Sequence, residues 1–326
     1  MAFGVTRSGE SLAGLTYRRA RPDELATCAG IWRTSINDYI VPMGQAEIPA
    51  EMNPIIRLYT HLQSTDADRF VVATLPDAEG ERIVAFVVAV VRERLWFLSM
   101  LFVLPEVQAQ GLGRDLLRRV LPADADGMAR STATDSAQPI SNALYATFDI
   151  VPRMPLLNLA GLPQRPEAFG ELPSGVVALS FDEIATGPPG SRGHQMLVDA
   201  IDALDRDLLG AAHPLDHRFL RQESRLGWLY RGPDGAPVGY GYVGEAGRIG
   251  PVAVVDDALL GPVLGHLTSA VAPRGAFAMW VGGAADRAVV PALQAGFRLE
   301  AFPLLLCWDR PFGDFSRYLP ISPGLL

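Results

Sequence analysis

The sequence predicts a mixed α/β fold, with α and β elements around a mixed sheet, arranged as two similar domains in tandem. Apolar runs of strand length alternate with segments of helical periodicity along a chain of 326 residues. The order of these segments in the first half recurs in the second half about 150 residues later, the usual size of one domain. Between the halves, residues 161–174 contain three prolines and are typical of a linker.

The composition is that of an ordinary globular protein, with 49% hydrophobic and 20% charged residues. No apolar run reaches about 18 residues, so we expect no membrane span. The N-terminus lacks the apolar segment of a secretory signal, and Cys28 and Cys307 are too few for a disulfide framework, which together predict a cytoplasmic protein. The net charge of −8 argues against nucleic acid as a partner. All 28 basic residues are arginine, which excludes lysine Schiff-base chemistry.

The first half is predicted to run strand, two helices, three strands, helix, strand, helix, strand. Pro22 with Asp23 and Glu24 marks the start of the first helix. The expected strands are 17–20, 69–75, 82–92, 95–104, 128–134 and 153–159. The expected helices begin near 21–25 and at 111 or 113, and cover 54–63 and 138–148, while 35–51 is expected to be a loop.

The most informative stretch is residues 95–120, which combines a strand, a turn and a helix start. Ten nearly continuous apolar residues end at Pro105, which cannot donate a ladder hydrogen bond. The next residues, Gln108-Ala109-Gln110-Gly111-Leu112-Gly113-Arg114, lead into a helix whose free backbone N–H groups favour phosphate oxygens. The turn lacks the lysine of a Walker loop and the third glycine of a Rossmann turn. A helix start with two permissive glycines and no ligand is the alternative.

This pattern, Gln108-x-x-Gly111-x-Gly113 after an apolar strand, resembles the acyl-CoA pyrophosphate loop of the GNAT N-acetyltransferase superfamily. The resemblance implies two GNAT-like domains and an acetyl-CoA co-substrate. It implies that Gln108, Ala109, Gln110, Gly111, Leu112, Gly113 and Arg114 bind the pyrophosphate. It also implies that the strand-exit backbone of Leu101, Phe102 and Val103 hydrogen-bonds the pantetheine arm where the sheet splits.

The resemblance extends to Leu144-Tyr145 on the helix after the fifth strand, although Ser141, Asp149 and Ile150 depart from the family pattern. It implies that Tyr145 is the general acid that protonates the CoA thiolate when an amine attacks the thioester. A phenol pKa of about 10 and a thiol pKa of about 8.5 are close enough for proton transfer. A tyrosine whose ring packs in the core is the alternative.

A general base is not evident, because the strand over 95–104 contains no acid. Glu106 lies beyond the end of this strand, on the side of the predicted phosphate-binding turn. Asp38, Tyr39 and Glu51 lie in the region that often lines the acceptor site in such proteins, and they could hold a cationic amine. Solvated loop acids are the alternative. The acceptor could be a small molecule or a peptide amine, and the oligomeric state stays open.

The second half repeats the order of strands and helices of the first half, but it lacks the predicted phosphate-binding turn and the tyrosine. The expected strands are 175–179, 228–231, 238–243, 248–255, 276–281 and 297–308, with helices over 194–209 and up to 295. Asp256 and Asp257 stand where a pyrophosphate would be repelled, and Ala292 takes the place of Tyr145. We therefore expect a GNAT domain with the acyl-CoA site over 15–160, a linker over 161–174, a degenerate copy over 175–310, and a tail over 311–326 that docks on a surface.

His213, Asp216 and His217 match no common zinc spacing and have no cysteine nearby, so the sequence predicts no metal. The predicted function is an acyltransferase that moves acetyl from acetyl-CoA to an amine by direct attack in a ternary complex. The alternatives are a non-catalytic acyl-CoA-binding or sensory protein and a purely structural GNAT-fold protein.

Overall fold

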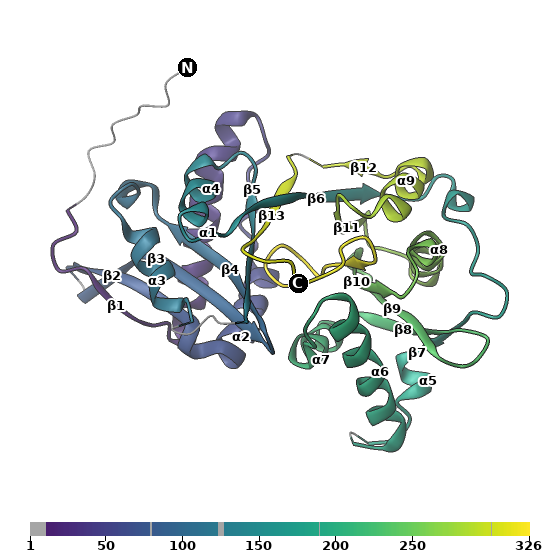
Figure 1. The fold of residues 1–326 in the computed structure, drawn as a ribbon. Coiled ribbons are helices and arrows are strands. Elements are labelled where there is room, and N and C mark those ends of the chain that lie inside the picture. Colours follow the sequence, from purple (N-terminus) through teal and green to yellow (C-terminus); the bar gives the residue numbers. More distant parts are fainter. Residues whose placement is uncertain (1–10, 79, 123–126, 189, 301) are drawn as a thin grey trace. The chain divides into compact units, whose positions relative to one another are not determined.

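The computed structural model describes residues 11–78, 80–122, 127–188, 190–300 and 302–326 (Figure 1). The chain forms two compact units. The first contains Met1–Val91 and Leu98–Asp126, and the second contains Arg92–Phe97 and Gly127–Leu326. Within the described part of the chain, no helix is both long and apolar enough to span a bilayer.

The first unit contains four neighbouring strands, the last of which is the apolar strand that ends before Pro105. Its strand order is β1-β2-β3-β4, with Thr16 paired to Thr74 between β1 and β2 and Phe70 paired to Val88 between β2 and β3. The elements are β1 (Thr16–Arg19), α1 (Leu25–Ile40), α2 (Asn53–Asp66), β2 (Phe70–Asp77), β3 (Gly80–Arg92), β4 (Leu95–Val103) and α3 (Leu112–Val120).

The two helices α1 and α2 precede the meander, as the sequence predicts, but α1 is longer than expected. Residues 35–40, expected to open a loop, continue the helix to Ile40, and the 3-10 turn Val41–Met43 ends it at Gly44 in the left-handed region. A buried aromatic group anchors α2 to the sheet. The ring of Tyr59 makes edge contacts with Phe70 and Phe86, at centroid distances of 5.9 and 5.4 Å.

The second unit holds a larger mixed sheet in the order β5-β13-β6-β11-β10-β9-β8-β7, with β12 beside β6 and β14 beside β10. Its strands are β5 (Ala129–Asp135), β6 (Val151–Gly161), β7 (Val177–Ser180), β8 (Leu226–Arg231), β9 (Pro237–Val243), β10 (Arg248–Val254), β11 (Phe277–Gly282), β12 (Arg298–Leu299), β13 (Leu304–Trp308) and β14 (Tyr318–Leu319). Its helices are α4 (Pro139–Ala146), α5 (Phe181–Ile184), α6 (Arg192–Leu208), α7 (Pro214–Gln222), α8 (Leu260–Ala270) and α9 (Asp286–Ala295).

Strand β13 comes from near the end of the chain, yet it lies between β5 and β6. It runs antiparallel to both strands, with Leu304 opposite Asp135 on one side and Leu156 on the other. The sequence predicts one strand over 297–308, but β12 and β13 are separate. Pro303 precedes β13, and a proline cannot donate a ladder hydrogen bond.

Strand β10 pairs with its sequence neighbour β9 on one side and with two different segments, β11 and β14, on the other. It is parallel to β11 only at Arg248 and Ile249, and further along it pairs with β14 of the C-terminal tail, through Val252 with Leu319. Glycine makes room for the tail. A Cβ on Gly250 would lie 2.7 Å from the carbonyl oxygen of Pro320.

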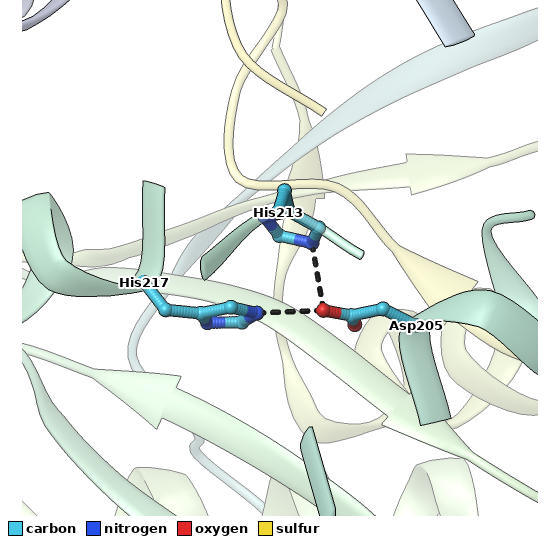
Figure 2. Close-up of side chains that lie close together, drawn as sticks. All are labelled: Asp205, His213 and His217. Carbon is cyan, nitrogen blue, oxygen red and sulfur yellow. Dashed lines mark hydrogen bonds and ion pairs between the residues drawn. The ribbon is translucent and has the colours of Figure 1, made fainter. Parts of the chain in front are cut away.

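The connection between α6 and α7 brings polar side chains into the interior of the second unit. Gly210 lies in the left-handed region just after α6, so the chain turns there and α7 begins four residues later. Asp205 of α6 then faces His213 and His217 (Figure 2). All three side chains are buried.

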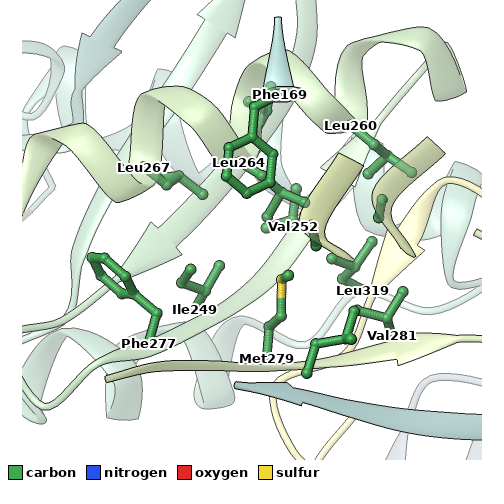
Figure 3. Packing of buried hydrophobic residues seen from close by; sticks show 14 of the residues in the cluster. Phe169, Ile249, Val252, Leu260, Leu264, Leu267, Phe277, Met279, Val281 and Leu319 are labelled. Atoms are coloured by element: carbon green, nitrogen blue, oxygen red, sulfur yellow. The ribbon is translucent and has the colours of Figure 1, made fainter. Parts of the chain in front are cut away.

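The apolar core of the second unit lies between the sheet and helices α8 and α9. Ile249 and Val252 of β10, Met279 of β11 and Leu264 of α8 belong to one buried cluster, and Leu319 of the tail belongs to it as well (Figure 3). Because the tail contributes a core residue, it is an integral part of this unit.

Candidate active site

The turn between β4 and α3 has a backbone suited to an anion. After β4, residues Pro105–Val107 form a 3-10 turn, and α3 starts at Leu112 with Gly111 as its N-cap. Ala109 and Gly111 have positive φ values of 62° and 91°. Left-handed residues within such a turn make a concave row of N–H groups, the geometry that binds anions in proteins. A non-glycine residue with positive φ is uncommon, and such residues concentrate at ligand sites.

The amide groups of this turn are available. Among the described residues, no acceptor takes a hydrogen bond from the backbone N–H of Gly111, Leu112 or Gly113. In the first turn of α3, the N–H of Asp115 donates to the carbonyl of Gly111 at 3.1 Å. Gly111 is exposed, and an ideal Cβ there would meet no atom within 4 Å. The site therefore combines orphan N–H groups with the positive end of a helix dipole.

The acids near this turn are paired with other groups. Glu106 forms an ion pair with Arg82 at 3.3 Å, and Asp115 accepts a hydrogen bond from the Tyr17 hydroxyl at 3.3 Å. Burial and the neighbouring Asp115 raise the pKa of Tyr17, so its phenol keeps its proton. Arg119 lies over the Tyr17 ring, 3.8 Å from its centroid, and adds positive charge to this side of α3.

The exit of β4 opens toward solvent where the resemblance places pantetheine. The strand is fully buried from Leu95 to Ser99 and half-buried from Met100 to Val103. The carbonyl of Val103 already accepts two hydrogen bonds, one from Ser35 at 3.0 Å and one from the Gln108 side chain at 2.8 Å. The Gln108 side chain thus closes the turn. Sequence reasoning missed Ser35, because only the length of α1 brings its hydroxyl to β4.

The connection between α1 and α2 is held by a small polar network. Glu47 accepts hydrogen bonds from Arg33 at 2.6 Å and from the Asn37 side chain at 3.2 Å, and Asn37 also accepts from the backbone of Ile48. Glu51 accepts from the N–H of Asn53 at the start of α2. Asp38 and Tyr39, in the last turn of α1, are half-buried. The network fixes the segment that carries the predicted acceptor residues.

Tyr145 lies on α4 in the second unit and is almost fully buried, with 5% of its surface exposed. Burial and the neighbouring Cys307 raise its pKa, against a hydrogen bond with Ser141 that lowers it. The phenol is therefore protonated at neutral pH, as a general acid must be. Because its pKa is raised, proton transfer to a thiolate is less favourable than for an ordinary tyrosine.

Neither cysteine has the environment of a nucleophile. Cys28 and Cys307 are both fully buried, and burial raises the pKa of each thiol to about 12. A thiol with such a pKa is almost entirely protonated at neutral pH, and the reactive form is the thiolate. An acyl-enzyme on cysteine is therefore disfavoured.

The geometry agrees with comparisons to known proteins. Residues 35–149 match the model of the acetyltransferase (GNAT) family, a range that contains the turn, α3 and Tyr145. The chain therefore carries a GNAT acetyltransferase domain. No curated protein sequence matches this chain.

Solved structures show the same fold over nearly the whole chain. A candidate acetyltransferase from Pyrococcus horikoshii aligns with a TM-score of 0.72 and 14% identity, covering 98% of each chain. A GCN5-related N-acetyltransferase from Sphaerobacter thermophilus aligns with a TM-score of 0.55 and 18% identity, covering 93% of this chain and 98% of that one. A tandem GNAT protein from the clavulanic acid biosynthesis pathway aligns with a TM-score of 0.50 and 14% identity, covering 91% and 99%. The fold is that of tandem GNAT proteins.

Proposed function

We propose that this protein is an acetyl-CoA-dependent N-acetyltransferase whose one acyl-CoA site lies in the predicted domain over 15–160. The observation that carries the proposal is the row of N–H groups at Gly111, Leu112 and Gly113, which donate to no acceptor in the part of the chain that the structure describes. A diphosphate carries negative charge and many acceptor oxygens, so it satisfies these groups and the helix dipole at once. Residues 108–114 would bind the diphosphate jointly.

The pantetheine arm would lie along the half-buried end of β4. Leu101 and Phe102 would offer backbone groups to its amides, and Val103 would offer its N–H, because its carbonyl already accepts from Ser35 and Gln108. The thioester carbon would then stand beyond the strand exit. A neutral amine would attack this carbon directly, forming the C–N bond while the C–S bond breaks, and the proton that the nitrogen loses would pass to solvent.

Tyr145 would give its proton to the departing CoA thiolate. The phenol holds that proton across the physiological range because its pKa is raised. Asp38, Tyr39 and Glu51 would bind the acceptor, since two carboxylates and a phenol favour a cationic amine over an anion. The acceptor class stays a primary amine on a small molecule or a peptide.

A second candidate is an acyl-CoA-binding protein without turnover. The observations that favour it are the burial of Tyr145 and the absence of any acid on β4, LWFLSMLFV. This protein would bind acetyl-CoA through the same turn but release no CoA when an amine is added.

A thiol-release assay separates the two candidates. The purified full chain is mixed with acetyl-CoA and a panel of small amines, amino acids and peptides, and free CoA thiol is followed with time. The enzyme candidate predicts amine-dependent thiol release that saturates with acetyl-CoA. Binding of acetyl-CoA without release for any amine supports the second candidate, and absence of binding contradicts both.

A further inference from the structure

We infer that Asp205, His213 and His217 form a buried binding site for one Zn²⁺ ion, next to the C-terminal tail within the second unit. The site is distinct from the proposed acyl-CoA turn. Each residue offers one ligand atom, and these atoms lie within 4.8 Å of one another. The sequence did not predict a metal because Asp205 lies on another helix, outside the His213–His217 segment.

Two histidines present the same ring nitrogen to one carboxylate oxygen (Figure 2). Nε2 of His217 lies 2.8 Å from Oδ2 of Asp205, and Nε2 of His213 lies 3.3 Å from the same oxygen. His213 and His217 are one helical turn apart, so their side chains share a face. Zinc ligands stand about 2.0 Å from the ion, which makes ligand atoms about 3 Å apart natural neighbours in its shell.

The outer nitrogen of His217 contacts an oxygen atom, as in histidines that bind metal. A ligating histidine donates its other N–H to a carboxylate or another oxygen, which fixes the ring orientation. Nδ1 of His217 lies 3.0 Å from the Tyr242 hydroxyl. Nδ1 of His213 is buried without a hydrogen-bond partner among the described residues, and its nearest carboxylate is Asp216 at 3.8 Å.

The surrounding groups hold the three ligands in place. Tyr240 donates a hydrogen bond to the other oxygen of Asp205 at 2.5 Å. Arg92 binds Asp216 through two hydrogen bonds of 2.7 and 2.8 Å, which neutralises that carboxylate and directs it toward His213. The remaining negative charge is that of Asp205. A buried carboxylate needs a compensating cation, and a divalent ion bound by two neutral histidines supplies it.

The hydroxyl of Tyr318 lies 3.1 Å from Nε2 of His213 and borders the three ligand residues. Tyr318 belongs to β14, so this hydrogen bond links the tail to the residues that would hold the ion. The rings of His213 and His217 stack, with centroids 4.3 Å apart and planes 23° apart. A shared ion therefore requires one ring to turn out of the stack. Because all three ligand residues are buried, the role of the ion is structural.

Without the ion, the same residues form a proton-bearing network. Burial would raise the pKa of Asp205, but the charges and hydrogen bonds of His213 and His217 hold it below its usual value. Burial lowers the pKa of His213, and the attraction of Asp205 reverses this and raises it. Burial and the charge of His213 lower the pKa of His217. Metal analysis distinguishes this hydrogen-bonded state from the metal-bound one.

The test uses the untagged full chain, unfolded in denaturant with a chelator and refolded with or without ZnCl₂. After removal of excess metal, elemental analysis should find about one zinc per chain in the zinc-refolded sample. That sample should also unfold at a higher temperature, and residues of the tail should exchange amide hydrogens more slowly. Zinc-refolded protein that contains no zinc and matches the metal-free sample in both readouts overturns the inference.

Variants locate the ion. His217→Gln and Asp205→Asn should lose the zinc, and the matched control His194→Gln, on the same helix as Asp205, should keep it. If the ligand variants fail to fold, Co²⁺ replaces Zn²⁺ in the native chain. Bound tetrahedral Co²⁺ should give visible absorption bands, and their absence counts against the site. Zinc retained by folded His217→Gln and Asp205→Asn variants would also refute this assignment.

Discussion

Two turns of this chain follow a buried strand and precede a helix, but they differ in what their backbone offers. After β4, the N–H groups of Gly111, Leu112 and Gly113 donate to no acceptor among the described residues. After β10, the side chain of Asp256 accepts a hydrogen bond from the N–H of Ala258 at 3.0 Å, and the N–H of Leu259 donates to the Asp256 carbonyl. The first turn can bind an anionic ligand. In the second turn, the carboxylate of Asp256 already occupies the corresponding position.

The strands before these two turns also differ in how far their ends are covered by other parts of the chain. The end of β4 is half-buried and leads to the open turn. The end of β10 is covered by the tail, because β14 pairs with Val252 and Ala253 and Arg317 bonds to Val254 and Val255. Ligand binding thus depends on which backbone groups the chain leaves unsatisfied, and similar element order alone does not decide it.

The largest expected effect comes from placing a side chain in the open turn. Gly111→Glu forces a left-handed backbone on a residue with a Cβ and brings a carboxylate to the anion site, so acetyl-CoA affinity should fall by about 100-fold. The matched control is Gly235→Glu, since Gly235 is also left-handed with no atom within 4 Å of an added Cβ. Calorimetry measures both variants. Equal affinities in the two would remove the turn from the site.

The next effect separates catalysis from binding. Tyr145→Phe removes the proposed acid and should lower kcat by about 100-fold while acetyl-CoA affinity stays unchanged. Tyr230→Phe, which removes a buried hydroxyl bonded to His266, is the control and should keep full turnover. Steady-state thiol release gives kcat, and calorimetry gives the affinity. An unchanged kcat in Tyr145→Phe would assign Tyr145 to packing alone.

A smaller effect concerns the stability of the first unit at a position outside the proposed acyl-CoA site. Glu24 is buried between Arg18 and Arg21, and its pKa is lowered, because the hydrogen bonds and charges of these arginines outweigh the effect of burial. A lowered folded pKa stabilises the protein above the unfolded value of about 4.3, and this contribution disappears as pH falls through the folded pKa.

Glu24→Gln should therefore lower the free energy of unfolding by about 1 kcal/mol at neutral pH. The difference from the native chain should shrink as the pH approaches 4 and below. Urea titrations across this range measure it, and acetyl-CoA affinity at neutral pH should not change. A difference that grows in acid would contradict the sign of the shift.

The smallest effect tests the turn after β10, in which the side chain of Asp256 accepts a backbone hydrogen bond. Asp256→Ala frees the N–H of Ala258 and should cost about 0.5 kcal/mol of unfolding free energy. Asp257→Ala is the neighbouring control, since no side-chain hydrogen bond of Asp257 is present among the described residues. Neither variant should create a second acetyl-CoA site, because β14 still covers β10. A second site in Asp256→Ala would show that the cap alone excludes the ligand.

The sequence predicted local features well. The strand, turn and helix over 95–120 were predicted because Pro105, Gly111 and the leucine spacing act over a few residues, and the structure confirms β4 and α3. The GNAT resemblance is confirmed by the family match over 35–149. The expected loop over 35–51 was wrong at its start, since α1 runs on to Ile40 and gives Ser35 its contact with Val103.

Long-range pairings were beyond the sequence. Nothing near Leu304–Trp308 indicates that β13 lies between β5 and β6, because strand neighbours are chosen by partners about 150 residues away. The buried cluster of Asp205, His213 and His217 also depends on residues that are apart in the sequence. His213 and His217 are visible in the sequence, but Asp205 joins them only through the turn at Gly210.

The most direct test is a calorimetric titration of the intact chain with acetyl-CoA. The difference between the two turns predicts heat from one site per chain, and that heat should vanish in Gly111→Glu while persisting in Gly235→Glu. No heat from the native chain, or two equivalent sites, would contradict the claim that unsatisfied backbone N–H groups after β4 define the one acyl-CoA site.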